Sequence, residues 1–195
     1  MLTNSLLEPA LVSLAYLLGS VPTALLVCNS MGIADPRQQG SGNPGATNVL
    51  RIGNKIAAAL TLTGDAGKGA LAVGVALWSN QSAGIAGLCA LAAILGHLFP
   101  MFGAYRGGKG IATLFGCMAV LSWPIMLIQL SIWLSIALTT RISSLASIAM
   151  ALLTPLLAWL IEPDLLSPLC LIALLLLARH RLNLVRLYRG DESRF

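Results

Sequence analysis

Residues 6–28 read LLEPALVSLAYLLGSVPTALLVC, and this stretch decides the fold class. It is long enough to cross the roughly 30 Å hydrocarbon core of a bilayer, which takes about 20 helical residues. No Lys or Arg precedes it, so we do not expect a cleaved signal peptide, which needs a basic leader. We predict a retained transmembrane helix whose acidic end, at Glu8, faces outward. Gly19 and Pro22 predict a kink near its inner end.

The rest of the chain has the same character. Of its 195 residues, 57% are hydrophobic and only 10% are charged, which is too little polar surface to coat a soluble globule. Further apolar stretches run over residues 55–79, 82–103, 110–139, 143–161 and 165–179. We predict an all-α integral membrane protein. Because no repeat or linker is visible, we treat residues 1–195 as a single transmembrane domain.

The 12 Lys and Arg residues set the expected topology, because positive residues concentrate on the cytoplasmic side. We expect the glycine-rich segment 64–69 and the Trp123-Pro124 pair to end helices. The N-terminus is then outside, a short helix over 46–63 dips in from the inner face, and the C-terminus is cytoplasmic. The predicted crossings, about seven with some of them short, are 6–28, 67–79, 82–101, 110–121, 124–139, 143–161 and 165–186.

Charge and composition exclude several classes of protein. The net charge of +5 fits anionic headgroups or an anionic substrate better than nucleic acid, because the basic residues sit at the ends of apolar segments. The four cysteines are scattered, and the two histidines, His97 and His180, are far apart. We therefore expect no metal site and no cofactor. We interpret the cysteines as small core residues.

The first polar island is GSGNPGATNVLR, residues 40–51. It matches G-x-G-x-x-G, but no βαβ unit surrounds it, so a dinucleotide site is not expected. Successive glycines let backbone amides converge on an anion, and the following helix points its positive end at it. An ordinary inner loop with a polar cap and one arginine is the alternative. The predicted phosphate contacts are Gly40, Gly42, Asn43, Thr47 and Asn48, beside Ser41 and the planar cation of Arg51.

The second island is YRGGKGIAT, residues 105–113. Residues 103–110, GAYRGGKG, differ from a Walker A loop at one position. Gly110 stands where a magnesium-binding Ser or Thr would be, so a nucleotide hydrolase is not expected. We predict a phosphate cradle formed by Gly107, Gly108 and Gly110, with Lys109 as a point charge at the start of the next helix.

The third island is ARHRLNLVR, residues 178–186. His180 and Asn183 share one helix face, although a histidine at such a boundary also serves as a plain polar anchor. We expect Glu192 to pair with a nearby arginine and hold the tail.

Two further polar groups lie in apolar stretches. Asp65 and Lys68 sit three residues apart, and they are either functional or a self-neutralising structural pair. For His97, close to Pro100, we favour a structural hydrogen bond.

Taken together, the segments GSGNPGATNVLR, GDAGKG, GHLFPMF with RGGKGIAT, and RHRLNLVRLYRGDES resemble the bacterial acyl-phosphate:glycerol-3-phosphate acyltransferase family, the PlsY proteins. The resemblance covers nearly the whole chain in order. It implies a seven-helix inner-membrane enzyme that moves a fatty acyl group from acyl phosphate to the sn-1 hydroxyl of glycerol 3-phosphate, without coenzyme A or carrier protein. The family's important residues fall on Ser41, Arg51, Gly107, Gly108, Lys109, Gly110, His180, Asn183 and Glu192.

The chemistry implied by this resemblance suits the residue inventory. Both substrates carry a phosphate, so two anion-binding centres are needed beside one carbonyl. An acyl phosphate is already activated, so positioning and charge stabilisation can supply most of the rate. We expect direct attack by the glycerol 3-phosphate hydroxyl, with Ser41, Arg51, Lys109, His180 and Asn183 as the catalytic set, and with Asp65, Lys68 and Glu192 as structural support.

The expected partners are acyl phosphate, glycerol 3-phosphate and membrane lipids. Nucleic acid is not expected. The sequence leaves the oligomeric state open, and a monomer is consistent with it. The expected location is the bacterial inner membrane, with the active site facing the cytoplasm. The rival is a transporter of a phosphorylated metabolite, which we disfavour because every predicted anion-binding island lies on one side, whereas a transporter presents its site to both faces.

Overall fold

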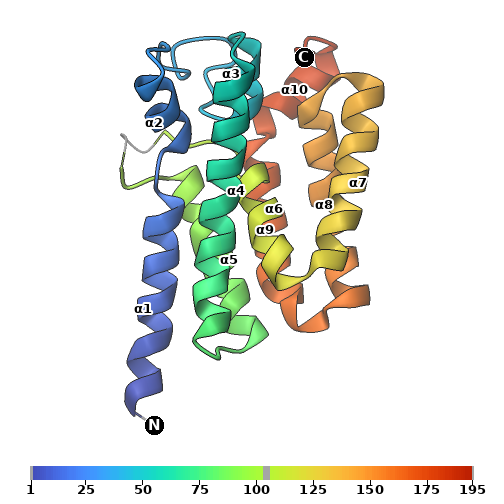
Figure 1. The fold of residues 1–195 in the computed structure, drawn as a ribbon. Helices are drawn as coiled ribbons and strands as arrows, with labels where there is room; N and C mark the ends of the chain where they lie inside the picture. Colours follow the sequence, from blue (N-terminus) through green and yellow to red (C-terminus); the bar gives the residue numbers. More distant parts are fainter. Residues whose placement is uncertain (1, 103–105, 195) are drawn as a thin grey trace. The chain divides into compact units, whose positions relative to one another are not determined.

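The computed structural model describes residues 2–102 and 106–194, and these residues form helices joined by loops, with no β-strand among them (Figure 1). The predicted all-helical class is confirmed. By its internal contacts the chain divides into two compact units, Met1–Leu121 and Ser122–Phe195, which are described separately below. The prediction of a single domain stays a prediction.

The first unit is built around one long helix, α4, which packs against every other helix of the unit. The expected kink in the first crossing is confirmed, because α1 ends at Gly19 and α2 begins at Thr23. Pro22 lies in this break, where it has no backbone N–H to continue the helical ladder. The helices are α1 (Leu2–Gly19), α2 (Thr23–Ser30), α3 (Ala46–Arg51), α4 (Lys55–Trp78), α5 (Ala83–Leu98) and α6 (Ile111–Leu121).

The expected helix break at residues 64–69 is wrong. Helix α4 runs without interruption for 24 residues, or about 36 Å at the helical rise, enough to cross a bilayer. The expected short helix over 46–63 is correspondingly only α3, which ends at Arg51. The glycines of α4 do not end it because helices in lipid tolerate glycine and use it for close packing.

That close packing is visible where α4 meets α6. A β-carbon added at Gly69 would overlap the backbone carbonyl of Thr113, and one at Gly116 would overlap the carbonyl of Ala66. Small residues at a helix crossing let the backbones approach, which supplies van der Waals contact that lipid cannot replace. Gly69, one of the glycines in the predicted break, therefore forms part of the contact between α4 and α6.

The second unit is a helical hairpin followed by a bent pair. Polar side chains join α7 to α8: the buried Gln129 Nε2 donates to Thr154 Oγ1 at 2.9 Å, and the half-buried Trp133 Nε1 donates to Ser147 Oγ at 3.0 Å. The predicted last helix is not continuous, because it bends by 54° between α9 and α10. The elements are α7 (Trp123–Thr140), α8 (Ser143–Ile161), the 3₁₀ turn η1 (Pro163–Leu165), α9 (Leu166–Arg179) and α10 (Arg181–Arg189).

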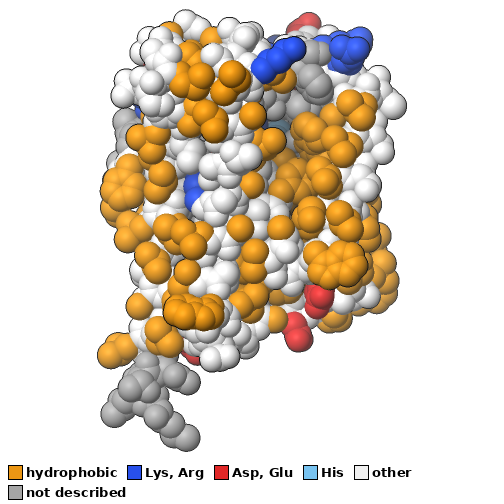
Figure 2. Space-filling view, viewed as in Figure 1, with side chains coloured by type: hydrophobic (Ala, Val, Ile, Leu, Met, Phe, Trp, Pro, Cys, Tyr) orange, Lys and Arg blue, Asp and Glu red, His pale blue; other side chains and the backbone are white. Residues whose placement is uncertain are grey.

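The outer surface of these helices is rich in apolar side chains, as expected in a bilayer (Figure 2). Among the described residues, three stretches are long and apolar enough to span a membrane: Leu6–Ser30, Trp123–Thr140 and Ser143–Ile161. The bent pair from Pro163 to Arg189 is a fourth candidate, and α5 and α6 are shorter apolar helices. The seven crossings and their orientation stay predictions.

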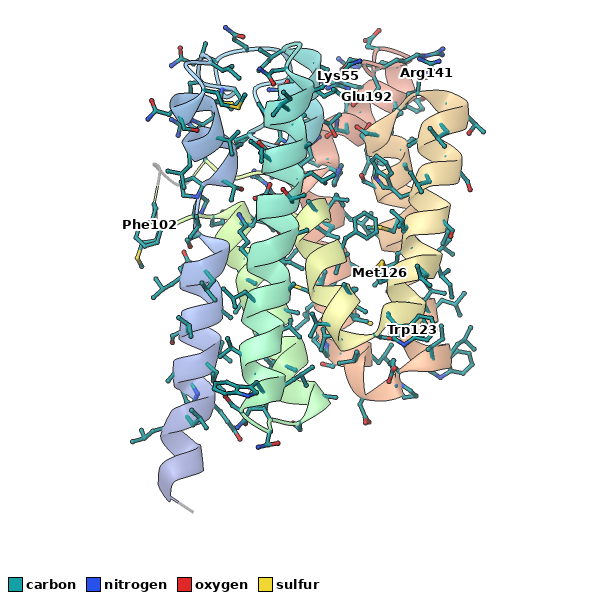
Figure 3. The ribbon with its side chains drawn as sticks, in the orientation of Figure 1. Lys55, Phe102, Trp123, Met126, Arg141 and Glu192 are labelled. Atoms are coloured by element: carbon teal, nitrogen blue, oxygen red, sulfur yellow. The ribbon has the colours of Figure 1, made fainter. Side chains whose placement is uncertain are left out.

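Helix α7 illustrates the expected polarity of a span. Trp123 and Arg141 lie at its opposite ends (Figure 3). Tryptophan is typical of a membrane–water interface, and arginine is typical of the cytoplasmic end.

Candidate active site

The first polar island forms the loop between α2 and α3, and one side chain organises it. Asn48 is 1% exposed, and its Nδ2 donates to the carbonyl oxygens of Pro36 at 2.8 Å and Gln39 at 2.9 Å. Its Oδ1 accepts from the backbone N–H of Ser41 at 2.8 Å. Both donors and the acceptor of this amide therefore serve the loop itself, so Asn48 supports the backbone that carries Ser41.

Gly40 shows why this loop needs glycine beside that amide. Its φ angle is +59°, in the left-handed region that side chains rarely adopt, and a β-carbon there would overlap Asn48 Oδ1. Gly42 also has a positive φ, of +70°. The loop is thus folded back on α3 in a shape that only glycines allow.

An ion pair closes the loop on its other side. The Arg37 guanidinium contacts the Asp35 carboxylate at 2.7 Å between Nη2 and Oδ2, and the Arg37 backbone N–H also donates to Oδ1 at 2.9 Å. The side-chain hydrogen bonds from Arg37 hold the pKa of Asp35 below its usual value, although partial burial opposes them. This local ion pair precedes the glycines in the chain and fixes the backbone at residues 35–37.

The remaining predicted residues of this island lie along the loop and α3. Ser41 is exposed, Asn43 and Thr47 are half-buried, and Arg51 is the half-buried last residue of α3. The helix begins at Ala46 as predicted. A polar, partly exposed loop therefore carries a hydroxyl, amides and a guanidinium, the groups that bind phosphate.

The second island joins α5 to α6. Gly107 and Gly108 are buried, Lys109 is half-buried, and Gly110 has a φ of +84° immediately before α6 begins at Ile111. Residues 103–105 of the predicted loop lie outside the described residues. Lys109 and the preceding glycines therefore lie at the N-terminal, positive end of the 11-residue helix α6, and the predicted phosphate cradle stays a prediction.

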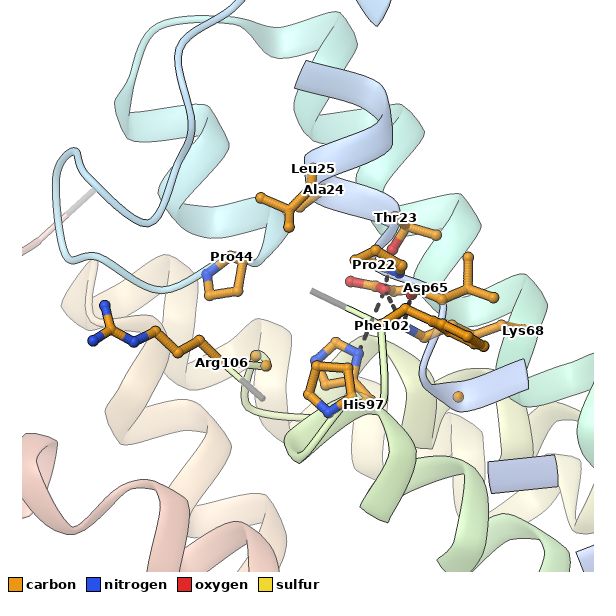
Figure 4. Close-up of a pocket in the computed structure, with 15 residues that line it drawn as sticks. Pro22, Thr23, Ala24, Leu25, Pro44, Asp65, Lys68, His97, Phe102 and Arg106 are labelled. Carbon is orange, nitrogen blue, oxygen red and sulfur yellow. Dashed lines mark hydrogen bonds and ion pairs between the residues drawn. The ribbon is translucent and has the colours of Figure 1, made fainter. Parts of the chain in front are cut away.

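Asp65 and Lys68 form the predicted pair in the interior of the first unit. Lys68 Nζ lies 2.8 Å from Asp65 Oδ1 and donates to the carbonyl of Val21 at 2.9 Å, while Thr23 Oγ1 donates to Asp65 (Figure 4). Both charged side chains are less than 10% exposed. Lys68 thus donates a hydrogen bond to a carbonyl group in the break between α1 and α2. The Asp65–Lys68 pair therefore stabilises the backbone there.

His97 lies beside this pair, and a small cavity opens next to it. The cavity has a volume of about 20 Å³ and is lined by residues that include Pro22, Leu25, Phe102 and Arg106 (Figure 4). A water needs roughly 10–15 Å³, so this volume holds one or two waters. His97 Nδ1 lies 3.2 Å from Thr113 Oγ1, which is the structural hydrogen bond that the sequence favoured.

The third island lies in the second unit. His180 is 1% exposed, and its Nδ1 lies 2.8 Å from the carbonyl oxygen of Leu176. Asn183 is 6% exposed, and its Nδ2 donates to Glu192 Oε1 at 2.6 Å, which also accepts from Ser144 Oγ at 2.8 Å. The carboxylate of Glu192 therefore fixes Asn183 to the start of α8.

Sequence reasoning missed three residues that act in these clusters: Thr23, Thr113 and Ser144. Each is a hydroxyl residue at or near a helix start, where such residues are common, so no local pattern marks them out. Glu192 accepts hydrogen bonds from Ser144 and Asn183, and the pairing of Glu192 with an arginine stays a prediction. In the described residues, no three His, Cys, Asp or Glu side chains group as metal ligands.

An all-helical membrane protein with glycine-rich, cation-bearing loops and a buried histidine and asparagine fits the class of membrane enzymes. The sequence profile of the family described as "Glycerol-3-phosphate acyltransferase" matches residues 9–190. The chain belongs to this family, and it is an acyltransferase of phospholipid synthesis. The resemblance noted in the sequence is thereby confirmed.

Individual relatives agree. The glycerol-3-phosphate acyltransferase of Laribacter hongkongensis (strain HLHK9) is 53% identical over 186 residues, 93% of this chain and 92% of the relative. That of Shewanella loihica (strain ATCC BAA-1088 / PV-4) is 46% identical over 190 residues, 97% of this chain and 94% of the relative.

Two solved structures share the fold over the length of the chain. They are crystal structures of PlsY (YgiH), an integral membrane glycerol 3-phosphate acyltransferase, in a glycerol 3-phosphate form and a lysophosphatidic acid form. Their TM-scores are 0.90 and 0.88, at 36% and 35% identity, and each comparison covers 96% of this chain and 95% of the other.

Proposed function

We propose that this protein transfers a fatty acyl group from acyl phosphate to the sn-1 hydroxyl of glycerol 3-phosphate. The ester C–O bond of lysophosphatidic acid forms, the bond between the acyl carbon and the phosphate oxygen breaks, and inorganic phosphate leaves. One observation carries the proposal: a structure with the same fold exists in a glycerol 3-phosphate form and in a lysophosphatidic acid form. These two molecules differ by the acyl group that the reaction adds.

The two phosphates need separate cationic or amide-rich sites, and the first unit offers two loops of that kind. We assign the acceptor phosphate to the loop of Gly107, Gly108, Lys109 and Gly110, because it combines a cation with the N-terminus of α6. Arg51 holds a phosphate through its planar fork of donors, which fits two oxygens at once. Ser41 and the neighbouring amides then orient groups around the carbonyl.

His180 has a hydrogen bond that suits it to proton transfer. The carbonyl oxygen of Leu176 can only accept, so Nδ1 carries the proton and donates to it. In the neutral ring Nε2 then bears the lone pair, and this atom can take the proton of the attacking hydroxyl. A phosphate oxygen of the substrate is the alternative acceptor. Glu192 restrains Asn183, which we assign to orienting the same groups.

The proposed location is the bacterial inner membrane, with both phosphate loops facing the cytoplasm. A membrane site on that side lets a lipid-soluble acyl donor meet a water-soluble acceptor. The transporter alternative is not favoured, because the family that matches residues 9–190 is one of acyltransferases.

The test uses the purified chain in detergent or nanodiscs with acyl phosphate and glycerol 3-phosphate, and it follows released phosphate and lysophosphatidic acid together. We expect equal amounts of both products with no added coenzyme A or carrier protein. Turnover only with an acyl thioester would overturn the proposal. An acyl group trapped on Ser41 would overturn direct attack while leaving the overall reaction intact.

A pair of lysine variants tests the assignment of the acceptor loop. Lys109→Ala should raise the KM for glycerol 3-phosphate by about tenfold or more, because it removes the cation of the loop. Lys55→Ala is the matched control, since Lys55 is an exposed cation of the same unit at the start of α4. Equal effects of the two substitutions would contradict a specific role for Lys109.

A further inference from the structure

His97 joins three parts of the first unit that are far apart in the sequence. It lies in the last turn of α5 and is 6% exposed. Its Nδ1 lies 3.2 Å from Thr113 Oγ1, in the first turn of α6, and 3.4 Å from Asp65 Oδ1 in the middle of α4. One ring therefore contacts the helix before the glycine loop, the helix after it, and the central helix of the unit.

The partners of Nδ1 fix which nitrogen carries the proton. A carboxylate oxygen accepts and does not donate, and a threonine hydroxyl is able to accept. An N–H at Nδ1 therefore directs its hydrogen between these two acceptors. Asp65 is itself held by Lys68 and by Thr23, so the anchor on this side of the ring is rigid.

The other side of the ring lies against the glycine loop. A β-carbon at Gly108 would overlap His97 Nε2, and one at Gly107 would overlap the carbonyl oxygens of His97 and Leu98. The backbone of residues 107–108 is therefore laid directly on His97. The histidine ring therefore requires a glycine at Gly108, and the backbone carbonyls of residues 97 and 98 require one at Gly107, whether or not a phosphate binds above them.

We propose that His97 is a positioning residue for the phosphate loop, acting through its ring rather than by touching the substrate. The ring is held on one side by the Asp65–Lys68 pair, and its other side supports the backbone at Gly107 and Gly108. Lys109 and the amides before α6 are then preorganised for the acceptor phosphate. This inference rests on the proposed assignment of the acceptor to that loop.

A plain packing role predicts a different outcome from a polar positioning role. His97→Leu fills much of the same space but has no polar atom. His97→Asn carries an amide that reaches the position of Nδ1, beside Asp65 and Thr113. If the ring only fills space, leucine should serve better than the smaller asparagine. If the ring positions the loop through its polar contacts, asparagine should restore function and leucine should not.

The experiment measures KM for glycerol 3-phosphate, kcat, and hydrogen exchange of the backbone amides at residues 106–111. For His97→Leu we expect KM to rise about tenfold while kcat falls by less than about threefold, with faster exchange in that segment. For His97→Asn we expect KM to lie closer to the wild-type value than to that of His97→Leu, with at least half of the increase in log KM removed. A His97→Leu protein with KM within about twofold of wild type and unchanged exchange would overturn the inference.

Two further variants separate the possible failures. Gln129→Met removes the buried hydrogen bond to Thr154 in the second unit and serves as a control for loss of stability. It should lower the melting temperature without changing KM. If Lys109→Ala raises KM and His97→Leu does not, the loop binds the acceptor and His97 does not position it. If neither substitution changes KM, the assignment of the acceptor to the loop fails, whereas the exchange measurement still tests the contact between His97 and the loop.

Discussion

Replacing Asn48 by alanine tests whether the first island is held in shape by a single amide. The substitution removes three hydrogen bonds, to Pro36 O, Gln39 O and Ser41 N. A neutral hydrogen bond contributes about 0.5–1.5 kcal/mol net, so three give about 1.5–4.5 kcal/mol. Because Gln39 and Ser41 are exposed and can rebind water, we expect the middle of that range, about 2–3 kcal/mol.

A loss of this size changes the ratio of ordered to disordered loop by about 30- to 150-fold, since each 1.36 kcal/mol is a factor of ten. We therefore expect Asn48→Ala to lower kcat/KM by at least about tenfold, together with faster hydrogen exchange over residues 36–41. Initial rates of phosphate release and exchange mass spectrometry measure the two effects on the same preparation.

Asn48→Asp refines the test, because it keeps the acceptor for Ser41 N–H but replaces the donor by an oxygen facing two carbonyls. We expect it to be at least as impaired as the alanine variant. Asn29→Ala is the matched control, at an exposed asparagine near the end of α2. If Asn48→Ala keeps kcat/KM within about threefold and leaves exchange at 36–41 unchanged, the loop does not depend on this amide.

The remaining predictions concern four other positions. Arg51→Lys should lower activity by about 100-fold although it keeps the charge, because the bidentate fork is lost; near-normal phosphate release would refute that role. Gly108→Ala should chiefly raise the KM for glycerol 3-phosphate, because the new methyl group displaces the loop from His97, and a lowered kcat at constant KM would count against this. Ser144→Ala should lower kcat by about two- to fivefold by loosening Glu192 and hence Asn183; unaltered turnover would mean that Glu192 needs no second donor. The pKa of Asp35 is lowered in the folded protein, so its ion pair stabilises the fold above the unfolded pKa and is lost as the pH falls through the folded value. Asp35→Asn should therefore lower the melting temperature at pH 7, and the difference from wild type should shrink below about pH 4; a difference independent of pH would contradict it.

The sequence predicted the starts of the helices after the first two polar islands, at Ala46 and Ile111, and the break after α1, because the signals there are local. It missed the break between α9 and α10 in the third island, where no proline or glycine marks the bend. It failed at residues 64–69, where glycines beside Asp65 and Lys68 indicated a loop. Hydropathy and turn propensity describe each residue on its own in water. In the folded unit the charges of Asp65 and Lys68 neutralise each other inside α4, so the helix continues through them.

The sequence by itself determined that this chain is a helical membrane protein, that its polar chemistry is concentrated in three islands, and that these islands match an acyltransferase family. Those conclusions follow from composition, hydropathy and short motifs, which are properties of neighbouring residues. Only the tertiary structure decided that Asn48 supports the backbone of Ser41, that Ser144 meets Glu192, and that His97 underlies Gly108. Hydrogen bonds such as that of Thr23 with Asp65 join residues 42 positions apart, and no local pattern encodes the approach of two helices that creates them.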